Sequence, residues 1–291
     1  MKPAAFTYHA PETAAEAAGL LADLGDEAKA IAGGQSLVPM LALRLAVFDH
    51  LVDLRRVGGL RGVERRNGDV WIGAGTTQTE VQRSALVAEA VPLLSRATPL
   101  IGHFQIRNRG TIGGSIAHAD AAAEYPAVAL ALDARLEALS PRGSRTIPAT
   151  EFFTGLWSTA LEPDELLTGI SFPVRGARSG FAVEEFARRS GDFAIAGAAV
   201  AVELDADGRV LRCGIGLFGL GSTPRRASAA EAAATGGGAD SLSAEEIGRD
   251  AIAELDSVPS DLHASADYRR HLGAVMVARA WQRAVKEASD A

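Results

Sequence analysis

The sequence predicts an α+β protein in which three regions follow one another along the chain. Up to Phe172, segments with the helical spacing of apolar residues alternate with short apolar runs typical of strands. After that residue, two alternating apolar runs flank residues 205–208 and predict an antiparallel hairpin. Three segments near 226–235, 243–254 and 265–287 then carry helical spacing toward the end of the chain.

The first region is expected to run helix, strand, loop and helix before a second strand. Apolar residues over 14–24 recur at helical spacing, and the short run 29–32 is typical of a strand. Ser36 is expected to cap the helix that follows, in which Pro39 falls in the first turn. A second strand is expected at 50–54.

The second region begins with a strand and a capped helix. Residues 69–74 form an apolar run, and Thr77 with Glu80 fits the capping-box pattern of a helix N-terminus. The further elements are expected in this order: a helix at 91–100, a loop at 107–118, a helix followed by a strand over 125–139, a turn at 140–148 and a strand at 165–172.

The composition excludes several classes of protein. The chain has 291 residues and a formal net charge of −7, so it offers no general attraction for nucleic acid. Its apolar stretches are interrupted before the roughly 20 residues that a membrane span needs, and the N-terminal segment lacks the apolar core of a secretory signal. We therefore expect a cytoplasmic protein. The single cysteine, Cys213, permits neither an internal disulfide nor a cysteine-ligated iron–sulfur cluster within this chain.

Two glycine pairs are the most informative local feature. Each pair, Gly33–Gly34 and Gly113–Gly114, has a serine close behind it. Glycine lets backbone N–H groups approach phosphate oxygens without a Cβ in the way, and a helix N-terminus adds donors. The two loops could therefore grip one pyrophosphate from both sides, or they could be two tight turns. Neither carries the Rossmann or P-loop fingerprint, so a nucleotide site here requires another architecture.

The two glycine segments together resemble a known family. AGGQSLVPMLALRLA, followed by RNRGTIGGSIAHADAAAEYPA, is similar to the FAD-binding medium subunits of molybdenum hydroxylases. The carbon monoxide dehydrogenase medium subunit and the flavin domain of xanthine dehydrogenase are members of that family. FARRSGDFAIAGAAVAV and SDLHASADYRRHLGAVMVARA match it further along, so the likeness runs from about Phe6 to Ala280.

The resemblance implies a vanillyl-alcohol oxidase-type FAD-binding fold of two α+β subdomains, followed by a C-terminal antiparallel sheet with helices. On this chain the first subdomain is expected at residues 1–55, the second at 56–174 and the C-terminal domain at 175–291. The resemblance also implies non-covalent FAD between the subdomains, with both glycine loops on its pyrophosphate.

Positions carried over from the family give the expected FAD site, and neither a catalytic residue nor a metal ligand is among them. The resemblance places the isoalloxazine near Ala117 and His118. It makes Ile101 and Leu167 apolar walls of the site. The FAD contacts expected from the two glycine segments are Lys29, Ile31, Ala32, Gly33, Gly34, Gln35, Ser36, Leu37, Gly110, Thr111, Gly114 and Ser115.

Three places depart from the residues that relatives often carry. Glu124 stands where they often have aspartate, and it is expected to contact a polar part of FAD. Phe193 stands where the carbon monoxide enzyme has tyrosine near the flavin ring, which keeps apolar shielding and removes a hydroxyl. Glu184 and Glu185 occupy a place where lysine is frequent, which removes the expectation of a basic contact there.

Several side chains also have a purely structural interpretation. His118 is more typical of a hydrogen-bonded packing residue than of a proton donor. Cys213 falls in an expected strand and therefore in the core. Arg107 and Arg109 could support the second glycine loop or face a partner, and we favour the support.

The function that the resemblance implies is electron transfer. In the family, a molybdopterin-binding large subunit oxidises the substrate, and electrons pass through two [2Fe–2S] clusters on a small subunit to the FAD and then to an external acceptor. Large and small subunits are therefore the expected partners, in a dimer of heterotrimers. Two alternatives stay open: a stand-alone FAD-dependent oxidase or dehydrogenase, and a flavin-free scaffold subunit. The substrate pocket lies on another chain, so this sequence leaves the substrate and the acceptor open.

Overall fold

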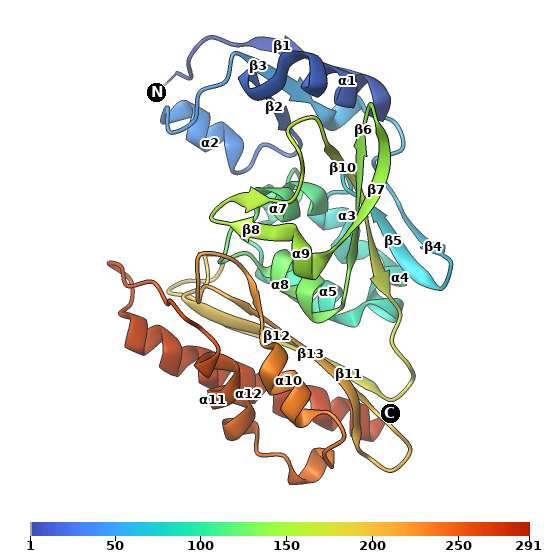
Figure 1. The fold of residues 1–291 in the computed structure, drawn as a ribbon, viewed down its shortest axis with the longest axis vertical. Coiled ribbons are helices and arrows are strands. Elements are labelled where there is room, and N and C mark those ends of the chain that lie inside the picture. The colour runs from blue at the N-terminus through green and yellow to red at the C-terminus, as the bar shows by residue number, and fades with distance from the viewer. Residues whose placement is uncertain (1) are drawn as a thin grey trace.

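The computed structural model describes residues 2–291, and each of the three sequence regions builds one main β-sheet (Figure 1). The elements of the first region are β1 (Thr7–His9), α1 (Ala14–Leu24), β2 (Ala28–Ile31), α2 (Leu37–Ala42) and β3 (His50–Asp53). The sheet is parallel, in the order β1-β3-β2. The expected helix at 14–24 is confirmed: Thr13 and Glu16 form a capping box, and Ala17 and Leu21 share a core cluster with Val52 of β3.

The second region forms a five-stranded antiparallel sheet with short helices around it. The strands are β4 (Val63–Arg66), β5 (Asp69–Gly73), β6 (Arg135–Ser140), β7 (Gly143–Pro148) and β10 (Leu166–Pro173). Their order is β4-β5-β10-β6-β7, and each neighbouring pair is antiparallel. The helices and the small additional hairpin are α3 (Gln78–Arg83), α4 (Ala85–Ala90), α5 (Pro92–Ala97), α6 (Phe104–Arg107), α7 (Ile112–His118), α8 (Glu124–Ala131), α9 (Ala149–Phe152), β8 (Phe153–Gly155) and β9 (Ser158–Thr159).

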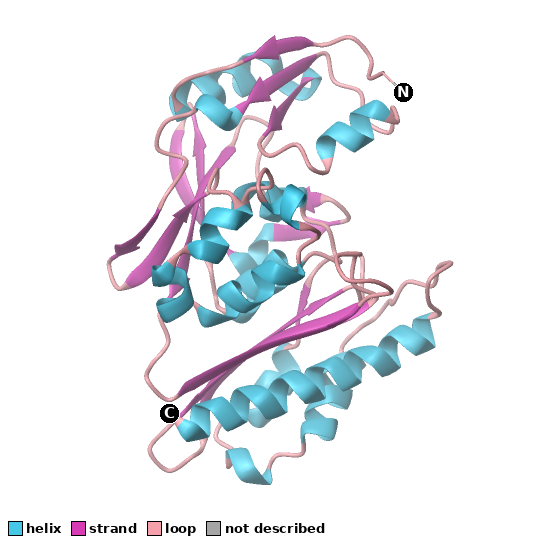
Figure 2. Ribbon diagram, turned by 180° about the vertical axis from the view of Figure 1, so that it is seen from behind, coloured by secondary structure: helices cyan, strands magenta, loops and turns pink. Residues whose placement is uncertain are grey.

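The third region is an antiparallel sheet with helices on one face. It contains β11 (Ser179–Phe186), β12 (Ala196–Leu204), β13 (Val210–Phe218), β14 (Arg225–Arg226), α10 (Ser228–Ala234), α11 (Ala244–Ala253) and α12 (Ala266–Asp290). The strand order follows the chain, so the hairpin expected around 205–208 is confirmed as β12–β13, as are the three closing helices. Figure 2 shows the long helix α12 lying along this sheet. Their contact is close, since a Cβ at Gly180 would lie 1.8 Å from the carbonyl oxygen of Ala284.

Helix α8 joins the second and third regions into one core. All eight of its residues are buried, which is why its sequence shows no polar face. One face of the third sheet is covered by α12, and the opposite face packs against α8. Two glycines of β13 permit this close approach. A Cβ at Gly214 would lie 2.0 Å from the carbonyl oxygen of Ala131, and one at Gly216 would lie 2.0 Å from that of Ala127.

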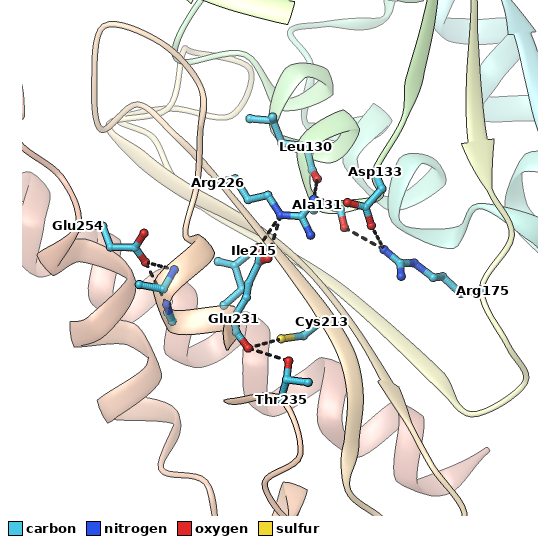
Figure 3. Close-up of polar contacts among 12 residues, drawn as sticks. Leu130, Ala131, Asp133, Arg175, Cys213, Ile215, Arg226, Glu231, Thr235 and Glu254 are labelled. Atoms are coloured by element: carbon cyan, nitrogen blue, oxygen red, sulfur yellow. Dashed lines mark hydrogen bonds and ion pairs between the residues drawn. The ribbon is translucent and has the colours of Figure 1, made fainter. Parts of the chain in front are cut away.

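A polar network crosses the same boundary (Figure 3). Asp133, which follows α8, forms an ion pair with Arg175 at 2.8 Å and another with Arg226 of β14. Arg226 also pairs with Glu231 of α10 at 2.8 Å and donates to the carbonyl oxygen of Leu130 at 3.1 Å. The Arg175 side chain is only 4% exposed, so solvent screens its interaction weakly. The network therefore ties the C-terminal sheet to the end of α8.

Two expectations about the second region are wrong. Residues 107–118 do not form a loop, because α6 and α7 cover most of them. Residues 140–148 do not form a turn alone, because Gly143–Pro148 is the edge strand β7. Most of its side chains are exposed, so the sequence lacks the alternation that reveals a half-buried strand. Among the helices described in residues 2–291, none has the length and apolar composition that a membrane crossing requires.

Candidate dinucleotide-binding site

The two glycine segments are about 80 residues apart in sequence, yet they lie in contact where the first two regions meet. We call this contact and its surroundings the seam. A Cβ at Gly33 would lie 2.2 Å from the carbonyl oxygen of Arg109 and 2.7 Å from Cα of Gly110. A Cβ at Gly114 would lie 3.5 Å from Cβ of Ala32. Glycine at 33 is therefore required by a close approach of one backbone to the other.

The first segment leaves its backbone donors free. Gly34 takes a left-handed φ of +74°, and the chain turns from β2 into α2. Within residues 2–291, the five consecutive amides from Gly33 to Leu37 donate to no protein acceptor. Ser36 stands at the N-cap position, as expected, but its side chain makes no capping bond. A run of free amides in a turn is a concave site for an anion such as a phosphate.

The second segment uses its backbone donors within the protein. The amide of Ile112 donates to the Thr76 carbonyl at 3.0 Å, and that of Gly113 donates to the Ala74 carbonyl at 2.9 Å. The amide of Gly114 donates to Oγ1 of Thr111, the N-cap of α7, at 3.0 Å. The amides of Ile112, Gly113 and Gly114 are therefore already used within the protein, and Gly114 is helical rather than left-handed.

Gly113 has a packing reason instead. A Cβ there would lie 2.4 Å from Cβ of Ala74 and 2.6 Å from its carbonyl oxygen, so α7 could not rest on the end of β5. This segment leaves side-chain hydroxyls free as donors. The hydroxyl of Ser115 is half-buried and makes no hydrogen bond within the described chain, and the Thr111 hydroxyl keeps its hydrogen for donation.

The arginines of this segment play different parts. Arg107 donates to the carbonyl oxygens of Ile101 at 2.9 Å and Gly102 at 3.0 Å, which confirms it as a support of the local backbone. The side chain of Arg109 is exposed and makes no hydrogen bond among residues 2–291, so its role as a support is wrong. With Arg55 and Arg61 it lines a cavity of about 170 Å³ between the two glycine segments. Sequence reasoning missed this cavity, because its walls come from four segments that are separate in sequence.

His118 lies at the other end of α7, near enough to Lys29 for that charge to affect its pKa. This helix of seven residues spans about 10 Å, which separates His118 from the contact between the two segments. Burial lowers the pKa of His118, while the charge of Asp120 raises it and that of Lys29 lowers it. The His118 ring also stacks on the indole of Trp157, with ring centroids 6.3 Å apart and planes at 10°. Sequence reasoning did not single out Trp157.

One buried and one half-buried carboxyl group lie near the start of α8. Glu124 is 8% exposed, and burial raises its pKa to about 8, with smaller contributions from Glu185 and Asp120. Burial raises the pKa of Glu185 to about 7. On β11, Phe181 packs into the core of the second region, and Glu185 shares its face of the strand. This face brings Glu185 toward Glu124, and its Oε2 is buried without a hydrogen-bond partner.

The remaining expected residues are distributed around this seam. Ile101 is half-buried, and the loop that carries Phe193 reaches its neighbourhood, since a Cβ at Gly191 would lie 2.8 Å from Cε1 of His103. Phe193 itself is 67% exposed. Leu167 of β10 is buried in the core of the second region, which α7 also joins. Ile31 ends β2 just before the free amides, Gln35 supplies one of them, and Ala117 precedes His118 on α7.

Two known family models match successive parts of the chain. Residues 4–175 match the FAD binding domain in molybdopterin dehydrogenase. Residues 181–284 match the CO dehydrogenase flavoprotein C-terminal domain. The first match covers all four segments that line the cavity, and the second begins inside β11.

Individual relatives are similar over almost their full length. The chain is 43% identical to the 6-hydroxypseudooxynicotine dehydrogenase complex subunit alpha of Paenarthrobacter nicotinovorans, covering 99% of this chain and 97% of the relative. It is 38% identical to the carbon monoxide dehydrogenase medium chain of Afipia carboxidovorans, with all of both chains covered.

Solved structures give the same result. Carbon monoxide dehydrogenase from Hydrogenophaga pseudoflava, in a form that lacks the Mo-pyranopterin moiety of the molybdenum cofactor, superposes with a TM-score of 0.95 at 40% identity over 99% of both chains. Quinoline 2-oxidoreductase from Pseudomonas putida 86 superposes with a TM-score of 0.92 at 35% identity over 99% of both chains. The agreement in sequence, fold and domain content shows that this chain belongs to the family of FAD-binding medium subunits of molybdenum hydroxylases.

Proposed function

We propose that this chain carries FAD as the electron-transfer subunit of a molybdenum-containing hydroxylase or dehydrogenase. Electrons would reach the flavin from [2Fe–2S] clusters on a partner subunit and leave it for an external acceptor. The single observation that supports the proposal best is the run of free amides from Gly33 to Leu37, held against the second glycine segment. Such a run matches the diphosphate of FAD, because it offers donors without a competing protein acceptor.

The residues of the seam fit the rest of the cofactor. Ser115 and Thr111 offer hydroxyls next to the amides, and His118 with Lys29 lies about one helix length away, where the isoalloxazine is expected. When bound, FAD supplies the redox chemistry. The protein binds it, orients it and excludes water from it, and no acid or base of this chain is assigned to catalysis.

The partners follow from the family and from the composition. Relatives are named as a medium chain or as a subunit of a complex, and this chain has a single cysteine, which lies in the core at Cys213. We therefore assign the iron–sulfur clusters to a small subunit and the molybdopterin to a large subunit, in a dimer of heterotrimers. The docked small subunit must reach the flavin, since electron transfer requires the two groups to be close.

Co-expression of this chain with the genes that neighbour its own tests the proposal. The expected product is a complex that contains FAD, [2Fe–2S] and molybdopterin, in which substrate reduces the flavin only when all three chains are present. A chain that purifies alone and oxidises a substrate unaided would instead be a stand-alone flavoenzyme. A complex that assembles with a colourless medium chain would make it a scaffold.

The flavin should be held without a covalent bond. Cys213 is buried in β13, far along the chain from both glycine segments, which leaves His118 as the candidate for attachment. Acid precipitation of the purified subunit should leave the yellow colour in the supernatant. Colour in the pellet, lost in a His118→Ala variant, would show covalent attachment at that ring.

A further inference from the structure

An exposed tryptophan stands at the tip of the β8–β9 hairpin. Leu156 and Trp157 are the two central residues of its turn, and their side chains are 58% and 55% exposed. The other tryptophans, Trp71 and Trp281, are both buried. The side chains of Leu156 and Trp157 lie outside the three core clusters, so packing in the core does not fix the position of the indole.

The backbone at this tip is also unusual. Trp157 takes φ +52°, whereas Leu156 is not among the residues with positive φ. In a two-residue turn of this pattern, the position of Trp157 is one that glycine or asparagine ordinarily occupies. A bulky residue in the left-handed region is strained, and such residues concentrate at ligand clamps and active sites.

The indole is aimed at the flavin end of the seam. It lies parallel to the His118 ring with centroids 6.3 Å apart, which is within the range of offset stacking. His118 closes α7, and the opposite end of that helix touches the loop with the free amides. Figure 1 shows the β8–β9 hairpin beside α7, on the side of the molecule where α2 also lies. The tip therefore stands over the place where the isoalloxazine is expected.

We propose that Trp157 is an aromatic cover for the flavin, lying against the isoalloxazine beside His118 and restricting the access of dioxygen to the ring. This inference rests on the proposed function, because it requires bound FAD. A planar indole excludes water and small oxidants from one side of the site. An electron-transfer subunit gains from such shielding, since electrons lost to dioxygen never reach the intended acceptor.

The full-length subunit loaded with FAD provides the test. In the flavin-free chain, iodide should quench part of the tryptophan emission, because Trp157 is exposed, and FAD should remove that accessible part. Trp157→Ala should raise the flavin emission several-fold at unchanged FAD content, since a stacked indole quenches flavin fluorescence. After reduction with dithionite, this variant should pass its two electrons to dioxygen, giving hydrogen peroxide, several-fold faster than the parent chain.

Two further variants separate covering from general damage. Trp157→Phe keeps a flat ring and should keep the slow reoxidation of the parent, while its flavin emission rises. Leu211→Ala removes a comparably exposed apolar side chain (55%) from β13 and should change neither property.

The outcomes that overturn the inference are distinct. If Trp157→Ala binds FAD with the emission and reoxidation rate of the parent, the cover is wrong and the proposed function stands. If the variant instead loses only its assembly with partner subunits, the indole is a partner contact and the cover is again wrong. If the parent chain binds no FAD at all, the proposed function fails, and this inference fails with it.

Discussion

Segments 33–37 and 111–115 both set a glycine pair before a helix, yet the fold treats their backbones in opposite ways. The first keeps five consecutive amides without protein acceptors. The second directs the amides of Ile112 and Gly113 into carbonyl oxygens at the end of β5 and gives that of Gly114 to its own N-cap. A glycine pair thus indicates a close approach to the backbone. Whether protein or ligand makes that approach depends on whether the neighbouring N–H groups already have acceptors within the protein.

The largest effect is expected from Gly114→Val, at the point where the two segments face each other. The new side chain would stand 2.8 Å from Oγ1 of Thr111 and would extend toward Ala32, so it should close the seam. FAD content should fall to background while circular dichroism stays that of a folded chain. Gly19→Val, in a helix position with open space around it, should keep its flavin. Normal flavin in soluble Gly114→Val would remove this segment from the cofactor site.

A pH dependence should follow from the carboxyl groups that the fold leaves unpaired near the seam. The pKa of Glu124 is about 8 in the folded chain against an ordinary 4.5, so its contribution to stability is complete below pH 4.5 and is lost as pH rises to 8. The flavin-free parent should lose on the order of 5 kcal/mol of unfolding free energy across that window relative to Glu124→Gln. Denaturant unfolding at several pH values measures this.

The control for that experiment is Glu89→Gln, whose carboxylate is exposed. Its unfolding free energy should follow the parent at every pH. Curves for Glu124→Gln and the parent that run parallel from pH 5 to 8 would show that Glu124 ionises normally in the folded chain. Asp120 and Glu185 are the charged neighbours that contribute to the shift, so Glu185→Gln should reduce the same pH dependence in part.

Gly113→Ala tests whether Gly113 serves the packing of α7 rather than the binding of FAD. Its Cβ would overlap Ala74, so we expect a loss of about 1–3 kcal/mol of unfolding free energy. The fraction that folds should bind FAD with nearly the affinity of the parent, because Gly113 offers no free donor. Thermal unfolding and flavin titration of the same samples separate the two. A chain of unchanged stability that has lost flavin would assign Gly113 to the ligand instead.

Ser115→Ala should have the smallest effect. It removes a hydroxyl that makes no bond within residues 2–291, so the flavin-free chain should be as stable as the parent. Loss of one hydrogen bond to the cofactor corresponds to roughly a tenfold weaker Kd for FAD. Ser95→Ala, also a half-buried serine, should leave the Kd unchanged. An unchanged Kd for Ser115→Ala would leave the first segment as the main anchor.

Local signals predicted much of the fold because they act over a few residues. The helix at 14–24, the capping box at Thr77, the β12–β13 hairpin and the three closing helices all depend on neighbours in sequence. The edge strand β7 escaped prediction because it buries almost nothing, and α7 escaped because its glycines suggested a loop. The boundaries near 55 and 174 stay predictions.

The residues of the candidate site could be predicted from the sequence better than the hydrogen bonds that they make. The glycine pairs pointed to a close approach, and the structure brings them together as expected. Which amides remain free could not be read from sequence, since it depends on Ala74 and Thr76 arriving from another strand end. The same holds for the stack of His118 on Trp157 and for the approach of Glu185 to Glu124, which join residues that are distant along the chain.

The ion-pair network around Asp133 limits how this protein can be recombined with its relatives. A splice between the FAD-binding part and the C-terminal part would take Asp133 from one parent and Arg226 with Glu231 from the other. A graft that lacks Asp133 leaves Arg226 paired with Glu231 alone, and one that lacks Arg226 leaves the half-exposed Asp133 with Arg175 and deprives the nearly buried Glu231 of its cation. The two parts match separate family models, but an exchange between relatives keeps this network only when both parts carry the charges that pair across the boundary.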